Sequence, residues 1–169
     1  FPYTTLFRST GGVSSGTMAV GASNGSWVFG GGSITSSGAL TKSGTGTLTL
    51  NSANSFGSIT HSGGVISLGN AGALGAGTIN WTAASTLQTS ALTSNVTIAN
   101  AIALSGTGDR TLNMYSAANP GGTNTVELSG QITGSAGRLF LNNSASGSYN
   151  PQYIFSNNTN SFTANIQIN

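Results

Sequence analysis

Residues 38–56 read GALTKSGTGTLTLNSANSF, and residues 63–79 continue with GGVISLGNAGALGAGTI. Apolar and polar residues alternate in both stretches, as in Leu48-Thr49-Leu50. This period of two is typical of a short β-strand that buries one face. The two stretches therefore predict short strands separated by turns rich in Gly, Ser and Asn.

The same alternation recurs along the rest of the chain. Further apolar pairs that flank one polar residue are Ile66/Leu68, Ile79/Trp81, Val96/Ile98, Leu112/Met114, Val126/Leu128 and Ile166/Ile168, and further strand candidates are residues 102–104, 139–141 and 153–155. No helical period competes with it, and the intervals are dominated by Gly, Ser, Thr and Asn, which are weak helix formers. The pattern predicts an all-β fold.

Repetition favours a stacked coil over a sandwich or a closed barrel. The triplet Asn54-Ser55-Phe56 returns at residues 160–162, each time after an Asn-containing turn. In a parallel β-solenoid, equivalent residues of successive coils lie about 4.8 Å apart, so stacked like charges would repel. Only 4% of the residues are charged, which fits this arrangement. We therefore predict a parallel β-helix of about six or seven coils, roughly 30 Å long.

The two quoted stretches resemble the passenger-associated strand repeat of autotransporters. That repeat runs Leu-Thr-Lys-x-Gly-x-Gly-Thr-Leu-x-Leu, then Ala-Asn-x-aromatic, Gly-x-Leu-x-Leu-Gly and Leu-Gly-x-Gly. The matching residues are Leu40, Thr41, Lys42, Gly44, Gly46, Thr47, Leu48, Leu50, Ala53, Asn54, Phe56, Gly64, Ile66, Leu68, Gly69, Leu74, Gly75 and Gly77. The repeat units span about 38–127 and, in a degenerate copy, 128–169. His61 departs from the pattern, because the repeat usually has an apolar residue there, and this puts the packing of its coil in doubt.

The resemblance implies a right-handed parallel β-helix that is truncated at both ends. It implies a stalk or adhesin, secreted or displayed at the cell surface of a Gram-negative-type bacterium through the outer membrane. The chain would be covalently continuous with a C-terminal β-barrel or another anchor, and an export signal is expected upstream. Its expected partners are glycans or the surface of a host or neighbouring cell. The alternative is a carbohydrate-binding or carbohydrate-active β-helix module whose catalytic coils lie outside these residues.

Residues 1–9, FPYTTLFRS, differ in composition from the rest of the chain. They resemble the translation of a short-read sequencing adapter, as expected of a gene fragment assembled from metagenomic reads. We therefore assign the β-solenoid to residues 10–169 and exclude residues 1–9 from the fold prediction.

Charge and cysteine content exclude several classes of function. The formal net charge is only +2 and its cations are scattered, whereas nucleic-acid binding requires clustered Lys and Arg. Cysteine is absent, which excludes disulfides, thiolate metal sites and cysteine nucleophiles. There is no apolar run of about 18 residues, so these residues are not expected in a membrane.

The ionisable side chains do not form a recognisable catalytic motif. After residue 9 they are Lys42, His61, Asp109, Arg110, Glu127 and Arg138. A glycosidase or lyase site needs paired carboxylates, and we expect Glu127 to face solvent alone and Asp109 to lie in a Gly-rich turn. We interpret His61 as a half-buried packing residue and Lys42 as a solvated edge residue. No catalytic, cofactor or metal site is predicted, and the chain is not expected to be an enzyme.

Two alternatives concern surface residues. The aromatic side chains Trp27, Trp81, Tyr115, Tyr149 and Tyr153 either line a sugar-binding groove or, as we favour, pack in the core or at its ends. Thr47 and Thr49 resemble the ordered hydroxyls of an ice-binding face, but this motif is not repeated in register.

Overall fold

Short strands and tight turns make up the part of the chain that the structure describes. The computed structural model describes residues 4–21, 23–90, 95–114, 125–144 and 152–169. The strands are β1 (Thr4–Ser9), β2 (Val13–Ser15), β3 (Met18–Val20), β4 (Ser26–Gly31), β5 (Ile34–Lys42), β6 (Thr47–Leu50), β7 (Ser55–His61), β8 (Val65–Leu68), β9 (Thr78–Trp81), β10 (Ser85–Thr89), β11 (Val96–Ile98), β12 (Ile102–Leu104), β13 (Arg110–Met114), β14 (Thr125–Leu128), β15 (Ile132–Asn143), β16 (Gln152–Phe155) and β17 (Ser161–Ile168). Within these residues the structure has no helix of the length and hydropathy required to cross a bilayer.

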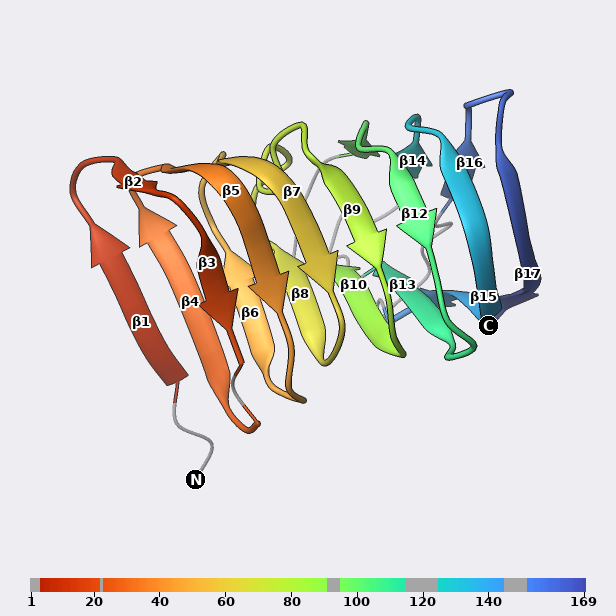
Figure 1. Cartoon of the computed structure of the whole chain (residues 1–169), viewed down its shortest axis with the longest axis horizontal. Helices are drawn as coiled ribbons and strands as arrows, with labels where there is room; N and C mark the ends of the chain where they lie inside the picture. Colours follow the sequence, from red (N-terminus) through yellow and green to blue (C-terminus); the bar gives the residue numbers. More distant parts are fainter. Residues whose placement is uncertain (1–3, 22, 91–94, 115–124, 145–151) are drawn as a thin grey trace.

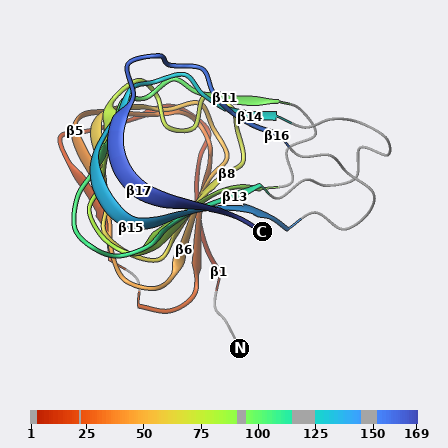
Figure 2. The ribbon, with the colours of Figure 1, turned by 90° about the vertical axis from the view of Figure 1, so that its right-hand side faces the viewer.

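The strand pairings of the described residues are all parallel, and they connect each strand to its equivalent in the next coil. Fourteen strands form one sheet, and β11, β14 and β16 form a second sheet of three. The strands follow one another along the long axis of the molecule (Figure 1), and the coils superpose when viewed along that axis (Figure 2). The fold is a parallel β-helix, as predicted.

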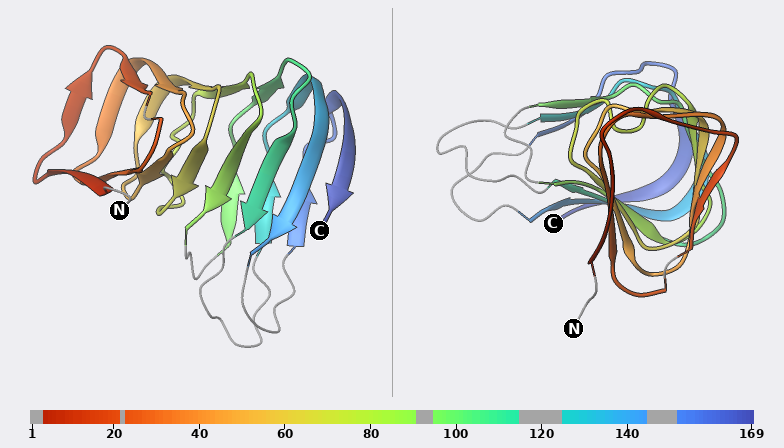
Figure 3. Two further views of the ribbon diagram at one scale, coloured as in Figure 1. Left: turned by 90° about the horizontal axis from the view of Figure 1, so that it is seen from below. Right: turned by 90° about the vertical axis from the view of Figure 1, so that its left-hand side faces the viewer.

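Each coil places its strands on defined faces. Face 1 contains β1, β4, β6, β8, β10 and β13, face 2 contains β2, β3, β5, β7, β9 and β12, and face 3 contains β11, β14 and β16. The long strands β15 and β17 begin on face 2 and end on face 1, so they join the two faces around a corner (Figure 3).

Stacked apolar side chains form the core between the faces. On face 1 the parallel register aligns one column, which contains Trp27, Leu48, Ile66, Leu87, Leu112, Leu141 and Ile168. Its members from Leu48 to Leu141 are buried. Burial of apolar surface contributes about 25 cal/mol per Å² of apolar area removed from water, so these columns are the main stabilising element of the fold.

The two copies of the Asn-Ser-Phe triplet occupy equivalent positions, as the repeat predicts. The Oδ1 atom of Asn54 accepts a hydrogen bond from the Ile34 amide at 2.9 Å, and that of Asn160 accepts one from the Ile132 amide at 2.8 Å. In both cases the asparagine side chain therefore connects its own coil to the preceding one. The coils differ in length, from 18 residues between Thr47 and Val65 to 30 between Ile102 and Ile132, which explains why the sequence repeat is degenerate.

The two ends of the stack differ from its middle. The predicted strand 166–168 forms, but Ile166 and Ile168 are 51% and 78% exposed because, among the described residues, no further coil covers them. At the other end, β1 lies within residues 1–9 and pairs with β4 in the parallel ladder.

Candidate functional site

Lys42 is buried inside the coil, and the prediction that it is a solvated edge residue is wrong. Its exposed fraction is 0%, and it follows the buried Leu40 by two positions on β5. Its Nζ atom donates to the carbonyl oxygens of Ser43 at 2.7 Å, and of Gly44 and Gly63 at 3.1 Å each. A buried ammonium group loses its hydrogen bonds to water. The inward-pointing carbonyl oxygens of the turn replace those hydrogen bonds. Burial lowers the pKa of Lys42.

His61 lies in the next coil, directly opposite Lys42 in the parallel register. It is only 1% exposed, so it is more deeply buried than the half-buried position predicted for it. Burial, followed by the charge of Lys42, lowers the pKa of His61 to about 4, although hydrogen bonds with the Gly64 and Gly63 backbone oppose this shift. Its Nε2 atom has no hydrogen-bond partner within the described residues. At neutral pH His61 is therefore an uncharged core residue.

The coil that contains His61 is well packed despite the departure from the repeat. The His61 ring stacks on Trp81 of the following coil, with ring centroids 5.7 Å apart and an angle of 13° between the planes. Trp81 is 1% exposed, and its Nε1 atom donates to the Ser85 hydroxyl at 2.6 Å. A flat imidazole thus occupies the position of an apolar side chain, which resolves the doubt that the sequence raised about this coil.

Arg110 is the second buried cation, with an exposed fraction of 0% at the start of β13. Its guanidinium group donates to the carbonyl oxygens of Trp81, Gly108 and Ser105. Burial lowers the pKa of Arg110, although the neighbouring Asp109 opposes this.

Together, Lys42, His61, Trp81 and Arg110 form what we call the cation corner, inside the turns that lead from face 2 to face 1. Both cations bind backbone carbonyl oxygens of these turns rather than carboxylates. A side chain that satisfies several turn carbonyls at once fixes the turn. The contacts of the cation corner are those of a structural element.

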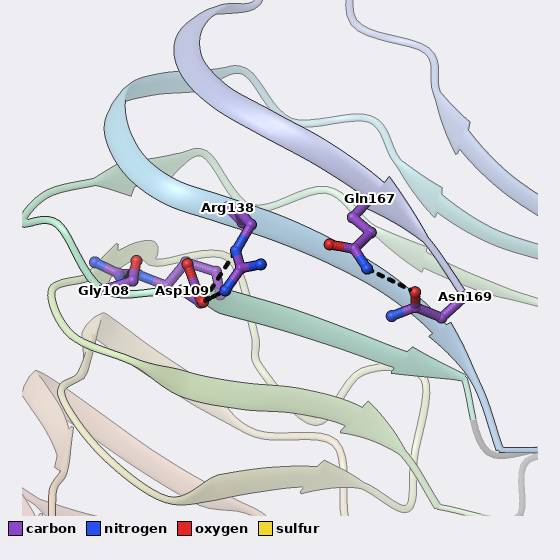
Figure 4. A network of polar contacts seen from close by, with 6 residues as sticks. Gly108, Asp109, Arg138, Gln167 and Asn169 are labelled. Carbon is purple, nitrogen blue, oxygen red and sulfur yellow. Dashed lines mark hydrogen bonds and ion pairs between the residues drawn. The ribbon is translucent and has the colours of Figure 1, made fainter.

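One pair of opposite charges lies on the outer surface, beside the start of β13. Asp109 and Arg138 make an ion pair with Nη2 and Oδ2 2.7 Å apart, and Figure 4 shows that the pair bridges neighbouring coils. The pair lowers the pKa of Asp109 and raises that of Arg138. The guanidinium carbon of Arg138 also lies 4.8 Å from the ring centroid of Phe140. The charge of Arg138 is therefore compensated.

The two carboxylates are not brought together. Glu127 lies on β14 of face 3, is half-buried, and accepts a hydrogen bond from the Thr97 hydroxyl at 3.2 Å. Asp109 precedes β13 on face 1 and faces Arg138. The described residues contain no group of three or more His, Cys, Asp or Glu side chains that could hold a metal ion. The arrangement of these residues offers no acid–base pair.

Among the described residues, the aromatic side chains singled out in the sequence do not line a common groove. Trp81 is in the core, and the Tyr153 hydroxyl donates to the carbonyl oxygens of Leu112 and Asn142. Trp27 lines a cavity of about 160 Å³ near the first coils. Tyr115 and Tyr149 lie outside the described residues. The described members of this aromatic set thus lie in different parts of the fold.

Side-chain amides line the outward side of face 1 in its later coils. Asn169 Nδ2 donates to Asn142 Oδ1 at 2.9 Å. Gln167 Nε2 donates to Asn169 Oδ1 at 3.0 Å (Figure 4). In the preceding coils, Gln88 and Asn113 occupy the same outward register position as Asn142. Sequence reasoning missed this surface, because the amides come from strands whose spacing along the chain is irregular.

Comparisons of the chain with protein-family models, curated proteins and solved structures give no match. The resemblance to the passenger-associated repeat thus depends on the matching residues alone.

Proposed function

We propose that this chain is a structural scaffold segment of a secreted or surface-displayed protein of the autotransporter-passenger type, and that it acts as a stalk or adhesin. Its role is mechanical: it extends the protein away from the cell and carries binding surfaces along its length. The proposal combines the parallel β-helix with the repeat residues at 38–56 and 63–79.

One observation carries the proposal. An uninterrupted parallel ladder connects β4, β6, β8, β10, β13 and β15 on face 1, with one column of large apolar side chains behind it. Each coil contacts mainly its neighbours, so length can be added or lost by whole coils without a new core. This organisation suits an elongated spacer.

The cation corner supports the same role. Lys42 belongs to the Leu-Thr-Lys signature and joins the turn carbonyls of its own coil, Ser43 and Gly44, to Gly63 of the next. Such cross-coil contacts hold successive turns in register. The buried cations thus have a structural use that requires no substrate.

The experiment is to place the full chain between a bacterial outer-membrane anchor and a terminal epitope tag. We expect the epitope to stand farther from the membrane, by atomic force microscopy of whole cells, than with a Gly/Ser linker of equal residue number. The matched control is the same fusion with Lys42→Ala and Arg110→Ala, which should lose the added height. Equal height for the solenoid and the linker would contradict the scaffold role.

A second measurement addresses catalysis directly. If the purified chain cleaved polysaccharides, and if Asp109→Asn or Glu127→Gln abolished the cleavage, the scaffold role would not be sufficient to describe the protein. We expect no such carboxylate-dependent cleavage, because each carboxylate has its own partner on a different face.

A further inference from the structure

The outward side of face 1 presents an array of neutral hydrogen-bonding groups in its later coils. Six residues, Gln88, Asn113, Phe140, Asn142, Gln167 and Asn169, make up what we call the amide face. Register pairs Gln88 with Asn113, Asn113 with Asn142, and Phe140 with Gln167. Equivalent side chains in such a ladder recur about every 4.8 Å.

The bonds within the amide face leave much of its hydrogen-bonding capacity open. Asn142 accepts from Asn169, and Asn113 accepts from the Ser144 hydroxyl at 2.8 Å. Gln88 donates to the Ser67 hydroxyl at 3.2 Å. A side-chain amide offers two N–H donors and an oxygen with two lone pairs, so each residue keeps donors and acceptors for a ligand. The ladder bonds at the same time fix the orientation of the amides.

An aromatic ring lies among these amides. Phe140 is half-buried on β15, between Thr111 of the preceding coil and Gln167 of the following one. The guanidinium group of Arg138 lies over this ring, 4.8 Å from its centroid. The part of the ring that Arg138 does not cover offers an apolar contact surface, while the neighbouring amides offer hydrogen bonds.

The electrostatics of the surface select an uncharged ligand. The charged groups next to the amide face are Arg138 and Asp109, and they neutralise each other. A polyanion such as a nucleic acid or an acidic polysaccharide requires several unpaired cations, because its affinity comes from phosphate or carboxylate contacts. The hydroxyl groups of a neutral polymer instead suit side-chain amides, because both kinds of group donate and accept hydrogen bonds.

We propose that the amide face binds a neutral polysaccharide chain that lies along the solenoid axis, with a sugar ring against the part of Phe140 that Arg138 does not cover and with its hydroxyl groups on the flanking amides. This inference deepens the adhesin role proposed above, because it names the ligand class and the surface. Successive sugars would meet equivalent amides in successive coils, so binding would strengthen with the length of the glycan.

The test is isothermal titration calorimetry of the full chain with hydroxyethylcellulose, glucomannan and dextran as neutral probes and polygalacturonate as the acidic probe. We expect binding of at least one neutral probe that persists in high salt. Phe140→Ala and Asn142→Ala should each weaken it by about tenfold, and Phe140→Tyr should stay within about twofold of the parent. The matched control is Asn80→Ala on the outside of face 2, which should leave the affinity unchanged.

Three results would overturn the inference: a folded parent that binds none of the neutral probes, binding restricted to polygalacturonate and lost in salt, or equal losses in Asn80→Ala and Asn142→Ala. Circular dichroism and urea unfolding of each variant separate a lost site from a lost fold. A chain that holds the epitope away from the membrane yet binds no glycan would refute this site alone. One that binds glycan without extending the epitope would refute the stalk role alone.

Discussion

Lys42 lies directly opposite His61 in the parallel ladder between β5 and β7, and both side chains point into the coil with exposed fractions of 0% and 1%. A cation thus faces a titratable imidazole inside a solenoid. The other groups around the imidazole are Trp81 on β9 and Arg110 on β13, and none of these residues is a carboxylate that could compensate a second charge.

This pair predicts a loss of stability in mild acid. The pKa of His61 is lowered to about 4 in the folded chain from its ordinary 6.5, so between these values the unfolded chain binds the proton more tightly. The contribution of the uncharged His61 side chain to stability is fully present above pH 6.5 and is lost as the pH falls towards 4. In total it amounts to about 3 kcal/mol of unfolding free energy. Urea unfolding at a series of pH values measures it.

The control for this prediction is His61→Leu, which restores the apolar residue typical of the repeat. This variant should lose the pH dependence between 6.5 and 4 while it keeps the fold. If the parent and His61→Leu lost stability in parallel over this interval, the buried imidazole would not be its source.

A substitution of Lys42 should affect both the stability and the neighbouring histidine. Lys42→Met removes the donor for three turn carbonyls, and hydrogen bonds to a charged group contribute about 1.5–3 kcal/mol each. Relief of the desolvated charge offsets part of this loss, so we expect a net destabilisation of about 2 kcal/mol. The pKa of His61 should rise, because the charge of Lys42 lowers it.

Urea unfolding and an NMR titration of His61 measure the two effects of Lys42→Met. The matched control is Thr41→Ala, which changes the adjacent outward side chain and should alter the stability by less than about 0.5 kcal/mol. An unchanged His61 pKa in Lys42→Met would show that the two side chains are not coupled.

Substitution by methionine should destabilise the chain much more at Arg110 than at Arg138. Arg110→Met leaves the carbonyl oxygens of Trp81, Gly108 and Ser105 without their donor and should cost about 3 kcal/mol in urea unfolding. Arg138→Met breaks a solvent-exposed ion pair with Asp109 and removes the guanidinium group from the Phe140 ring, and it should leave the unfolding midpoint nearly unchanged, above all at high salt. Equal effects would contradict the assignment of Arg110 to the interior.

Gly134 should not tolerate a side chain. Its φ is +85°, and a Cβ there would overlap the carbonyl oxygen of Leu104 in the preceding coil. Gly134→Ala should therefore destabilise the chain by about 2 kcal/mol or more in urea unfolding. The control is Gly16→Ala, where a Cβ meets nothing within 4 Å, and which should be neutral or slightly stabilising. Equal losses in both variants would contradict the close approach of the coils.

The sequence predicted the fold because the alternation of apolar residues, the weak helix formers and the repeated triplet at Asn54 and Asn160 all indicate stacked strands. The error at Lys42 is instructive. Its position two residues after Leu40 placed it on the buried face, but its charge favoured a solvated position. The alternation was the better guide, because turn carbonyls that only the three-dimensional structure brings together satisfy the buried ammonium group.

The surface was harder to predict than the core. Gln88, Asn113 and Asn142 share one register position, but the coils between them differ in length, so no fixed period marks them in the sequence. The partner of Asp109 was hidden for the same reason, because Arg138 is 29 residues away in the next coil. The periodicity of the sequence predicts which way a side chain points. Its neighbours along the solenoid axis can be identified only when the register between the coils is known.

The uncovered last coil predicts self-association of the isolated chain. Ile166 and Ile168 continue the inward positions of Leu139 and Leu141 but are 51% and 78% exposed, and within the described residues β17 pairs only with β15. An apolar edge strand with open backbone groups is a template for another chain. We expect the apparent mass in light scattering to rise with protein concentration.

Charges at this edge should suppress the association. Ile166→Lys with Ile168→Lys should give a concentration-independent monomer, because two cations at the edge repel a second edge and are costly to bury. Ile154→Lys on β16 is the matched control, since Ile154 is 42% exposed yet lies on face 3, and it should associate like the parent. A parent chain that stays monomeric at high concentration would show that the exposed column at β17 does not drive assembly.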